Sequence, residues 1–349
     1  MRPYRLGSIF ALGARFITRP EIQRFYCTTA AVVVATGTNP WYNAPEGIFA
    51  TGKRCVPVPI ERRLELVMNI QITSDSTCDL SPEQLMQHQI ALVPLAVAMD
   101  GRDYHDGVDI RPQDIYDHVA KGGGLPVTAA VNAAQYEAVF AQYARDYDAV
   151  IHINISAEFS SCYQNACLAA QQFDNVYVVD SRNLSTGHGL VVLRAAELAE
   201  QGVPAAEIVE NLREMTSRVE ASFILDQLQY LKKGGRCSAV AVLGANLLKL
   251  KPCIEVRDGK MGVGKKYRGS FDRCLEAYIT DQLAGREDLE LQRIFVTHSG
   301  VEDHTLQVAL DTVRRLQPFE EICVTTAGCT ISSHCGPSTI GVLFVRKKP

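Results

Sequence analysis

Apolar strand-like segments alternate with helix-like segments from residue 68 to about residue 218. This alternation predicts a parallel β-sheet covered by helices on both faces. A helix start is clearest at Ser81-Pro82-Glu83-Gln84, because serine caps a helix, proline suits its first position and glutamine bonds back to the cap. Strands are expected at residues 69–74, 91–99, 149–155 and 176–179, and helices from residue 81, at 109–120, and from about residues 132, 162, 185 and 204.

Three hydroxyl residues in this half are expected at strand-to-helix junctions, namely Thr128, Ser160 and Ser185. In parallel sheets covered by helices, ligands bind beyond the carboxyl ends of the strands. We therefore predict that these hydroxyls lie near a ligand site.

The pattern changes after residue 218. Asp258-Gly259 predicts a tight hairpin turn. Strands and helices around it no longer alternate regularly. We expect a smaller α+β domain with a mainly antiparallel sheet, whose last strands carry His334. The chain is thus predicted to be α/β, with an N-terminal parallel-sheet α/β/α domain at 68–218, an α+β domain at 219–349 and a ligand cleft between them. The elements expected after residue 218 are strands at 223–225, 252–256, 294–297, 322–325 and 339–345, and helices at 228–236, from 271 and at 301–316.

The first 67 residues differ from the rest in composition. They contain nine Lys or Arg and four Glu, a net charge of +5, and show no sustained periodicity. We interpret residues 1–67 as a disordered extension or as the product of a start site placed too far upstream.

Charge and cysteine content limit the function classes. Beyond residue 67 there are 26 basic and 35 acidic residues, which argues against nucleic-acid binding. The 11 cysteines form no C-x-x-C pair, so free thiols in a reducing cytoplasm are expected rather than a metal site. No apolar run approaches the ~20 residues that a membrane span needs.

A single histidine stands out in the segment GCTISSHCGPSTIGVLF, residues 328–344. His334 precedes Gly336 and Pro337, which fix a tight backbone path. The plain interpretation is a core histidine beside a turn, with Thr128 and Ser160 acting as helix caps. The functional interpretation is that Thr128, Ser160 and His334 converge on one anion. Two hydroxyls and an imidazole could supply the hydrogen bonds that a buried carboxylate requires.

Several motifs together carry a family resemblance. They are TSDSTCDL at 73–80, PVTAAVNAAQY at 126–136, SAEFSSCYQNA at 156–166, VVDSRNLSTGHG at 178–189, LQYLKKGGR at 228–236, NLLKLKPCIEVRDGK at 246–260 and HCGPSTIGVLF at 334–344. In order and spacing the chain resembles the DegV family of bacterial fatty-acid-binding proteins that serve a fatty acid kinase. The resemblance covers nearly everything after Met68.

The resemblance implies that a long-chain fatty acid lies between the two domains, with its carboxylate held by Thr128, Ser160 and His334. It implies no catalytic residue, metal or cofactor in this chain. The partners would be the fatty acid and a kinase subunit, with peripheral membrane contact during ligand exchange. The family's S-Q-P-S after the threonine is Ala129-Ala130-Val131-Asn132 here, and its G-T after the serine is Ser161-Cys162. Both changes keep the hydroxyl and alter the loop around it.

Other polar residues receive supporting roles in this interpretation. We place Asp75, Ser76, Ser161 and Ser185 around the ligand contacts; turn closure and helix capping are the alternatives. A kinase docking face is assigned to Lys232, Lys233 and Arg236, which would otherwise be a solvated helix end.

Two other function classes remain open. One is a Ser/His acyl hydrolase that uses Ser160 and His334, although the sequence has no G-x-S-x-G elbow. The other is a stand-alone lipid sensor or carrier without a kinase. Cys162 is interpreted as a small packing residue, since a reactive thiol needs a lowered pKa.

Overall fold

The computed structural model describes residues 24–27, 30–33, 68–241 and 250–348. Contacts divide the chain into Met1–Arg63 and Leu64–Pro349. In the first unit, β1 (Arg24–Cys27) pairs antiparallel with β2 (Ala30–Val33), a hairpin that we did not expect. Otherwise the prediction for residues 1–67 lies outside the described residues. The second unit holds both expected domains, and the boundary between 218 and 219 remains a prediction.

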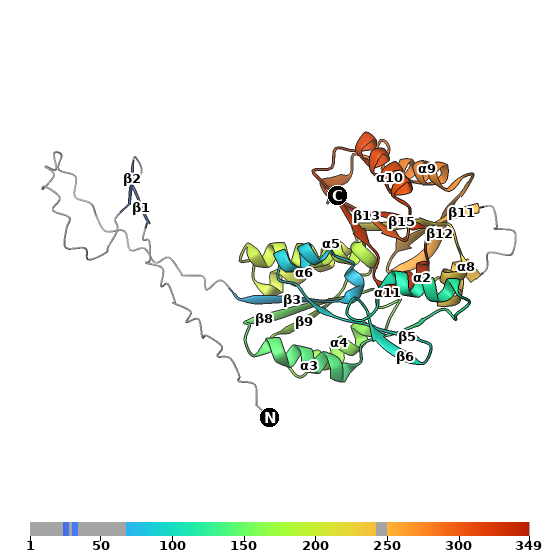
Figure 1. Ribbon diagram of the computed structural model, residues 1–349. Coiled ribbons are helices and arrows are strands. Elements are labelled where there is room, and N and C mark those ends of the chain that lie inside the picture. The colour runs from blue at the N-terminus through green and yellow to red at the C-terminus, as the bar shows by residue number, and fades with distance from the viewer. Residues whose placement is uncertain (1–23, 28–29, 34–67, 242–249, 349) are drawn as a thin grey trace, which may run out of the picture. The chain divides into compact units, whose positions relative to one another are not determined.

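A four-stranded parallel sheet forms the first domain, as predicted. Its strand order is β4-β3-β8-β9, and every pair is parallel. The central strand β8 is buried at every position, as expected for a strand covered on both faces. Figure 1 shows α3 and α4 on one face of this sheet and α5 and α6 on the other. The bounds are β3 Ile70–Asp75, β4 Ala91–Val93, β8 Ala149–Asn154, β9 Val176–Asp180, α3 Ala133–Ala144, α4 Cys162–Ala170, α5 Ser185–Glu200 and α6 Ala205–Thr216.

The strand predicted at residues 91–99 is wrong as a single element. It is divided into β4 and β5 (Ala96–Met99) around Pro94, which has no N–H to donate to a ladder. β5 pairs antiparallel with β6 (Arg102–His105) and β7 (Val127–Ala129) in a separate three-stranded sheet. Thr128 therefore lies on an antiparallel strand. The prediction that it lies at the carboxyl end of the parallel sheet was wrong.

Three short helices follow β3 and β6. The helix η1 (Ser76–Cys78) directly continues β3, and α1 (Pro82–Gln87) begins with the predicted capping box between Ser81 and Gln84. The helix α2 (Pro112–Ala120) begins three residues later than expected. The reason is that the residue before a proline favours an extended backbone, so the helix starts at Pro112 itself.

The second sheet has six strands in the order β12-β11-β10-β15-β13-β14. It is mainly antiparallel, as predicted, with one parallel pair between β13 and β14. Asp258 and Gly259 have φ angles of 51° and 80° and form the predicted hairpin turn between β11 and β12. The bounds are β10 Val219–Leu225, β11 Leu250–Arg257, β12 Lys260–Arg268, β13 Leu289–Ser299, β14 Glu321–Thr326 and β15 Thr339–Arg346, with α9 Phe271–Leu283 and α10 Asp303–Leu316.

His334 lies between the two last strands, β14 and β15, in the short helix α11 (Cys329–Cys335), which the sequence did not predict. The segment is a run of small residues followed by Gly336 and Pro337, so its sequence shows no helical period from which this helix could be recognised. Two further short helices, α7 (Gln229–Gly234) and α8 (Ser238–Ala241), follow β10.

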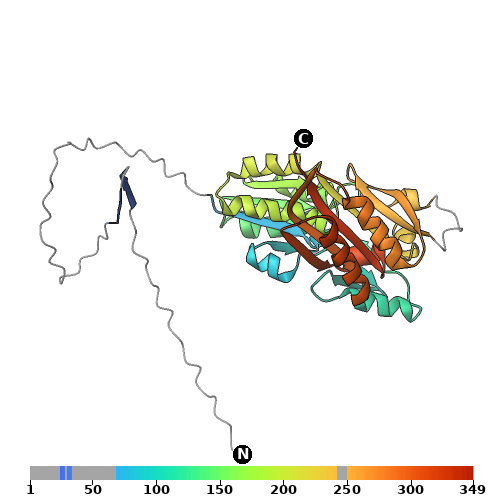
Figure 2. The same cartoon turned by 90° about the horizontal axis from the view of Figure 1, so that it is seen from above.

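The helix α5 lies between the two sheets (Figures 1 and 2) and contacts β3 and β8 on one side and β10, β13 and β15 on the other. Residues Ser185 to Leu193 of this helix are all buried, as expected for a helix enclosed all round. One hydrophobic core therefore extends through the parallel sheet, α5 and the inner face of the six-stranded sheet. A second core joins the outer face of that sheet to α9 and α10.

Candidate functional site

A cavity of about 190 Å³ is lined by residues of both domains. A single buried water needs roughly 10–15 Å³ by the same measure, so there is room for an organic molecule. Apolar side chains make up much of the wall, including Leu95, Ile155, Phe159, Leu231, Met261 and Leu343. The predicted ligand residues Thr128, Ser160 and His334 all line this cavity, together with Ser161, Ser185 and Arg236.

Thr128 and His334 are in direct contact. The Thr128 hydroxyl lies 2.8 Å from Nε2 of His334. Burial, and secondarily the charge of Arg236, lower the pKa of His334 to about 4, so the ring is neutral near pH 7. A neutral ring and a hydroxyl can each donate or accept one hydrogen bond here.

The other nitrogen of His334, Nδ1, has no hydrogen-bond partner within the described part of the chain. It lies against α7, because a Cβ atom added to Gly234 would be only 2.2 Å from it. The ring is therefore held in place by the close approach of a glycine backbone.

Ser160 lies just before α4 and is only weakly engaged. Its hydroxyl donates to the sulfur of Cys162 at 3.1 Å and accepts from the Cys162 N–H at 3.3 Å. Sulfur is a weak acceptor, so this hydroxyl remains available to a better one. The structure thus brings Thr128, Ser160 and His334 to one cavity and joins Thr128 to His334.

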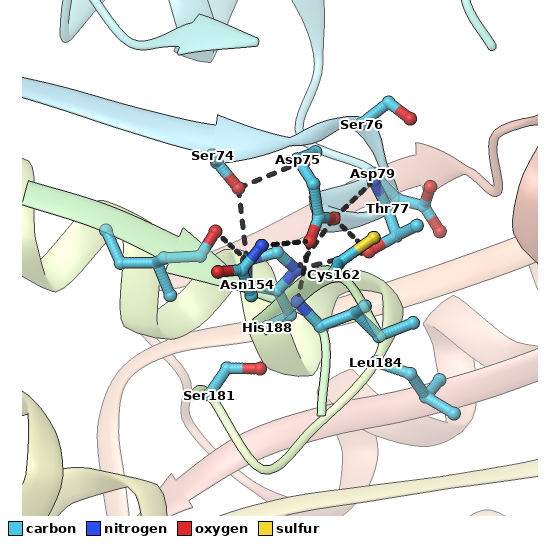
Figure 3. A network of polar contacts seen from close by, with 12 residues as sticks. Ser74, Asp75, Ser76, Thr77, Asp79, Asn154, Cys162, Ser181, Leu184 and His188 are labelled. Atoms are coloured by element: carbon cyan, nitrogen blue, oxygen red, sulfur yellow. Dashed lines mark hydrogen bonds and ion pairs between the residues drawn. The ribbon is translucent and has the colours of Figure 1, made fainter. Parts of the chain in front are cut away.

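Asp75 and Ser76, which we placed around the ligand, lie behind the cavity wall. Asp75 is fully buried and accepts hydrogen bonds from the Thr77 hydroxyl, the Asn154 amide and the Ile155 N–H (Figure 3). Ser76 donates to Asp106 at 3.1 Å and accepts from the Leu95 N–H. Their contacts hold the chain after β3 in place, whereas Ser161 and Ser185 line the cavity itself.

Two buried carboxyl groups that the sequence did not single out hold the start of α11. Asp106 accepts from the backbone N–H groups of Cys329 at 2.6 Å and Thr330 at 3.0 Å. Asp79 accepts from the Gly328 N–H at 2.9 Å and from the Ser185 hydroxyl. Burial raises the pKa of Asp79 well above its ordinary value. These contacts fix the helix that carries His334.

Ser74, His188 and Asp75 form a Ser-His-Asp arrangement among the buried polar residues around Asp75. The Ser74 hydroxyl lies 3.0 Å from His188 Nε2, and His188 Nδ1 lies 3.8 Å from Asp75 (Figure 3). All three side chains are fully buried and none lines a described cavity, so no substrate reaches them. Burial also lowers the pKa of His188. This arrangement is a structural part of the core.

The hydrolase alternative finds no support at the cavity. No hydrogen bond joins Ser160 to His334 among the described residues, so the serine has no adjacent base. Burial raises the pKa of the Cys162 thiol to about 11, which argues against a nucleophilic thiolate.

The three basic residues assigned to docking are all exposed. Lys232 and Lys233 lie at the end of α7. Arg236 also lines the cavity and donates from Nη1 to the Gly234 carbonyl at 2.9 Å. Within the described ranges no group of His, Cys, Asp or Glu is arranged to hold a metal ion. None of the described helices is long and apolar enough to cross a membrane.

A sequence model described as "Uncharacterised protein, DegV family" matches residues 69–347. The chain belongs to the DegV family. A DegV domain-containing protein of Caldanaerobacter subterraneus is 31% identical over 283 residues, covering 80% of this chain and 99% of the relative. This membership confirms the resemblance found in the sequence motifs.

Solved DegV structures have the same fold. A DegV family protein from Thermus thermophilus, described by its fatty acid binding, gives a TM-score of 0.73 at 30% identity and covers 80% of this chain and 100% of its own. DegV of Bacillus subtilis, described as a fatty acid binding protein, gives 0.68 at 28% identity with coverages of 80% and 100%. A stearic acid-binding protein from Eubacterium ventriosum gives 0.69 at 27% identity, with coverages of 80% and 98%. The predicted fold class is confirmed.

Proposed function

We propose that this protein binds a long-chain fatty acid, with the carboxylate at Thr128, Ser160 and His334 and the acyl chain in the apolar part of the cavity. The observation that carries the proposal is that these three polar residues line one largely apolar cavity. Structural relatives described as fatty-acid-binding proteins support the ligand class.

The chemistry of the three groups suits a carboxylate. A buried carboxylate must be hydrogen-bonded, since an unpaired charge away from water costs several kcal/mol. Thr128 and Ser160 can both turn their hydroxyls toward it, and the neutral His334 ring can donate through Nε2 in place of its contact with Thr128. The acyl chain contributes about 0.8 kcal/mol for each CH₂ removed from water. Arg236, which also lines the cavity, adds positive charge near the head group.

Three substitutions test the assignment. Thr128→Val, Ser160→Ala and His334→Ala each remove one donor, and we expect each to weaken fatty-acid binding about tenfold. Thr339→Val is the matched control, because the Thr339 hydroxyl lines the same cavity but already donates to the Cys335 carbonyl. Titration calorimetry measures the affinities, and mass spectrometry of lipid bound to the purified protein identifies the ligand. Unchanged affinity in all three variants would refute the carboxylate site.

The further part of the proposal is that this protein presents the carboxylate to a fatty acid kinase in the cytoplasm, without being a catalyst itself. The exposed Lys232 and Lys233 then belong to the face that meets the kinase. The nine free cysteines among the described residues suit a reducing compartment. Incubation with a fatty acid kinase, ATP and fatty acid tests this role. Acyl phosphate that forms only when this protein is present supports it, and binding without acyl phosphate supports the sensor or carrier alternative.

A further inference from the structure

The inner face of α11 carries a second polar residue beside the cavity. Thr330 and His334 are four positions apart, and both line the cavity. Residues at this spacing lie above one another on a helix, with Cβ atoms about 5–6 Å apart. Thr330 is therefore the next polar side chain along the same helix face.

The hydroxyl of Thr330 is left without a hydrogen-bond partner among the described residues. The side chain is also well buried, since the residue is only 4% exposed. An unpaired buried hydroxyl is destabilising, so a bound group that pairs with it would stabilise the protein.

The other buried hydroxyls that line the cavity are already paired. Ser185 donates to Asp79, Thr339 donates to the Cys335 carbonyl, and Ser299 donates to the Gly336 carbonyl at 2.8 Å. Thr297 contacts the hydroxyls of Thr186 and Thr325. Thr330 thus differs from the other buried hydroxyl residues of the cavity in having an unused hydroxyl.

A second unpaired side-chain atom near the cavity belongs to His298 on β13. Nδ1 of His298 also has no partner among the described residues. Side chains alternate along a strand, and the neighbouring Thr297 contacts Thr186 of α5 on the inner face of the six-stranded sheet. The side chain of His298 accordingly points away from α5, although the residue is among those that line the cavity. Burial lowers its pKa, and the charge of Asp303 opposes this effect.

We propose that the preferred ligand carries a hydroxyl group on its third carbon, and that Thr330 binds this hydroxyl while Thr128, Ser160 and His334 hold the carboxylate. This inference rests on the proposed function. A 3-hydroxy group extends from the chain two carbons beyond the carboxyl carbon. It lies farther from the carboxylate than a 2-hydroxy group, which suits a residue one helical turn from His334. Two hydroxyls are complementary, because each can donate to or accept from the other.

The test compares matched acids on the full-length protein by titration calorimetry. We expect the wild type to bind 3-hydroxytetradecanoic acid about five- to tenfold more tightly than tetradecanoic acid, the difference that one buried hydrogen bond provides. Thr330→Val should abolish this preference and leave the affinity for tetradecanoic acid unchanged. Thr330→Ser should retain the preference, and Thr339→Val, whose hydroxyl is already paired, should retain it too.

Two outcomes separate this inference from the proposed function. If the wild type binds tetradecanoic acid but shows no preference for the 3-hydroxy acid, the role of Thr330 is refuted and fatty-acid binding stands. If it binds neither acid, both proposals fail. An equal preference for 2-hydroxytetradecanoic acid would also overturn the assignment of the third carbon. The wild-type and Thr330→Ser comparisons keep the test decisive even if Thr330→Val does not fold.

Discussion

The protonation state and the orientation of the His334 ring are determined by the residues around it. Burial makes the ring neutral, Thr128 contacts one nitrogen, and the backbone at Gly234 confines the other. Any residue larger than glycine at position 234 would meet the ring. The conformation of the candidate ligand group therefore depends on a glycine in another helix.

Gly234→Ala tests this dependence. The new Cβ atom would lie 2.2 Å from Nδ1 of His334, so the ring must move away from its contact with Thr128. We expect fatty-acid affinity to fall about tenfold, as measured by titration calorimetry.

Gly262→Ala is the control for this substitution, because a Cβ atom there would meet nothing within 4 Å. Affinity in Gly234→Ala equal to that of Gly262→Ala would show that the glycine does not position His334.

Individual site residues could be found from the sequence only where a motif marked them. Thr128, Ser160 and His334 lie in such motifs, and the structure brings all three to one cavity; their role toward a ligand remains a prediction. Asp106 had no such signal, since the backbone group that it binds at Cys329 is 223 residues away. Thr330 was also missed, because an unpaired hydroxyl is recognised only when its surroundings are known.

At the scale of elements, α11 illustrates why a short helix between two expected strands was missed. A helix of seven residues is marginal by itself and leaves its first N–H groups unpaired. Here Asp79 and Asp106 satisfy those groups, and both belong to distant segments. Longer elements such as β8, α5 and α10 are marked by their own apolar content and helix or strand length, and they were predicted within a few residues.

Asp106→Ala should destabilise the protein and the site together. The substitution removes the acceptor for two backbone N–H groups of α11 and for the Ser76 hydroxyl. Hydrogen bonds to buried charged groups contribute about 1.5–3 kcal/mol each, so we expect the free energy of unfolding to fall by roughly 3 kcal/mol. Urea denaturation measures this loss.

Asp103→Ala provides the matched control, because Asp103 lies on the neighbouring strand β6 and is exposed. We expect it to change stability by less than about 0.5 kcal/mol. Fatty-acid affinity should fall in Asp106→Ala, since α11 carries His334, and should not change in Asp103→Ala. A stable Asp106→Ala variant with normal affinity would contradict the role given to this carboxyl group.

Across the whole molecule, buried titratable groups determine the response to acid. Burial lowers the pKa of His152 to about 3 and of His334 to about 4, and it lowers the pKa of His188 as well. In the unfolded chain histidine titrates near pH 6.5. Below that pH the unfolded state binds more protons than the folded state, so the stability that these rings contribute is complete above pH 6.5 and is lost as the pH falls.

Asp79 acts in the opposite direction. Because its folded pKa is raised, the folded state holds this proton more tightly than the unfolded state, and acid favours folding through this one group. Each group changes the free energy of unfolding by at most about 1.4 kcal/mol per pH unit. Burial lowers the pKa of His298 as well. Four histidines opposed by Asp79 therefore predict a net loss of stability as the pH falls below 6.5.

Thermal unfolding between pH 8 and pH 4 measures this slope. We expect the midpoint to change little above pH 7 and to fall steeply between pH 6 and pH 4.5. His152→Gln should reduce the slope of the free energy of unfolding by at most about 1.4 kcal/mol per pH unit, because one of the buried rings no longer titrates. His304→Gln should leave it unchanged, because His304 is exposed. A slope that is the same in both variants would show that proton uptake by buried histidine does not drive acid unfolding, and that carboxyl groups in ion pairs are responsible instead.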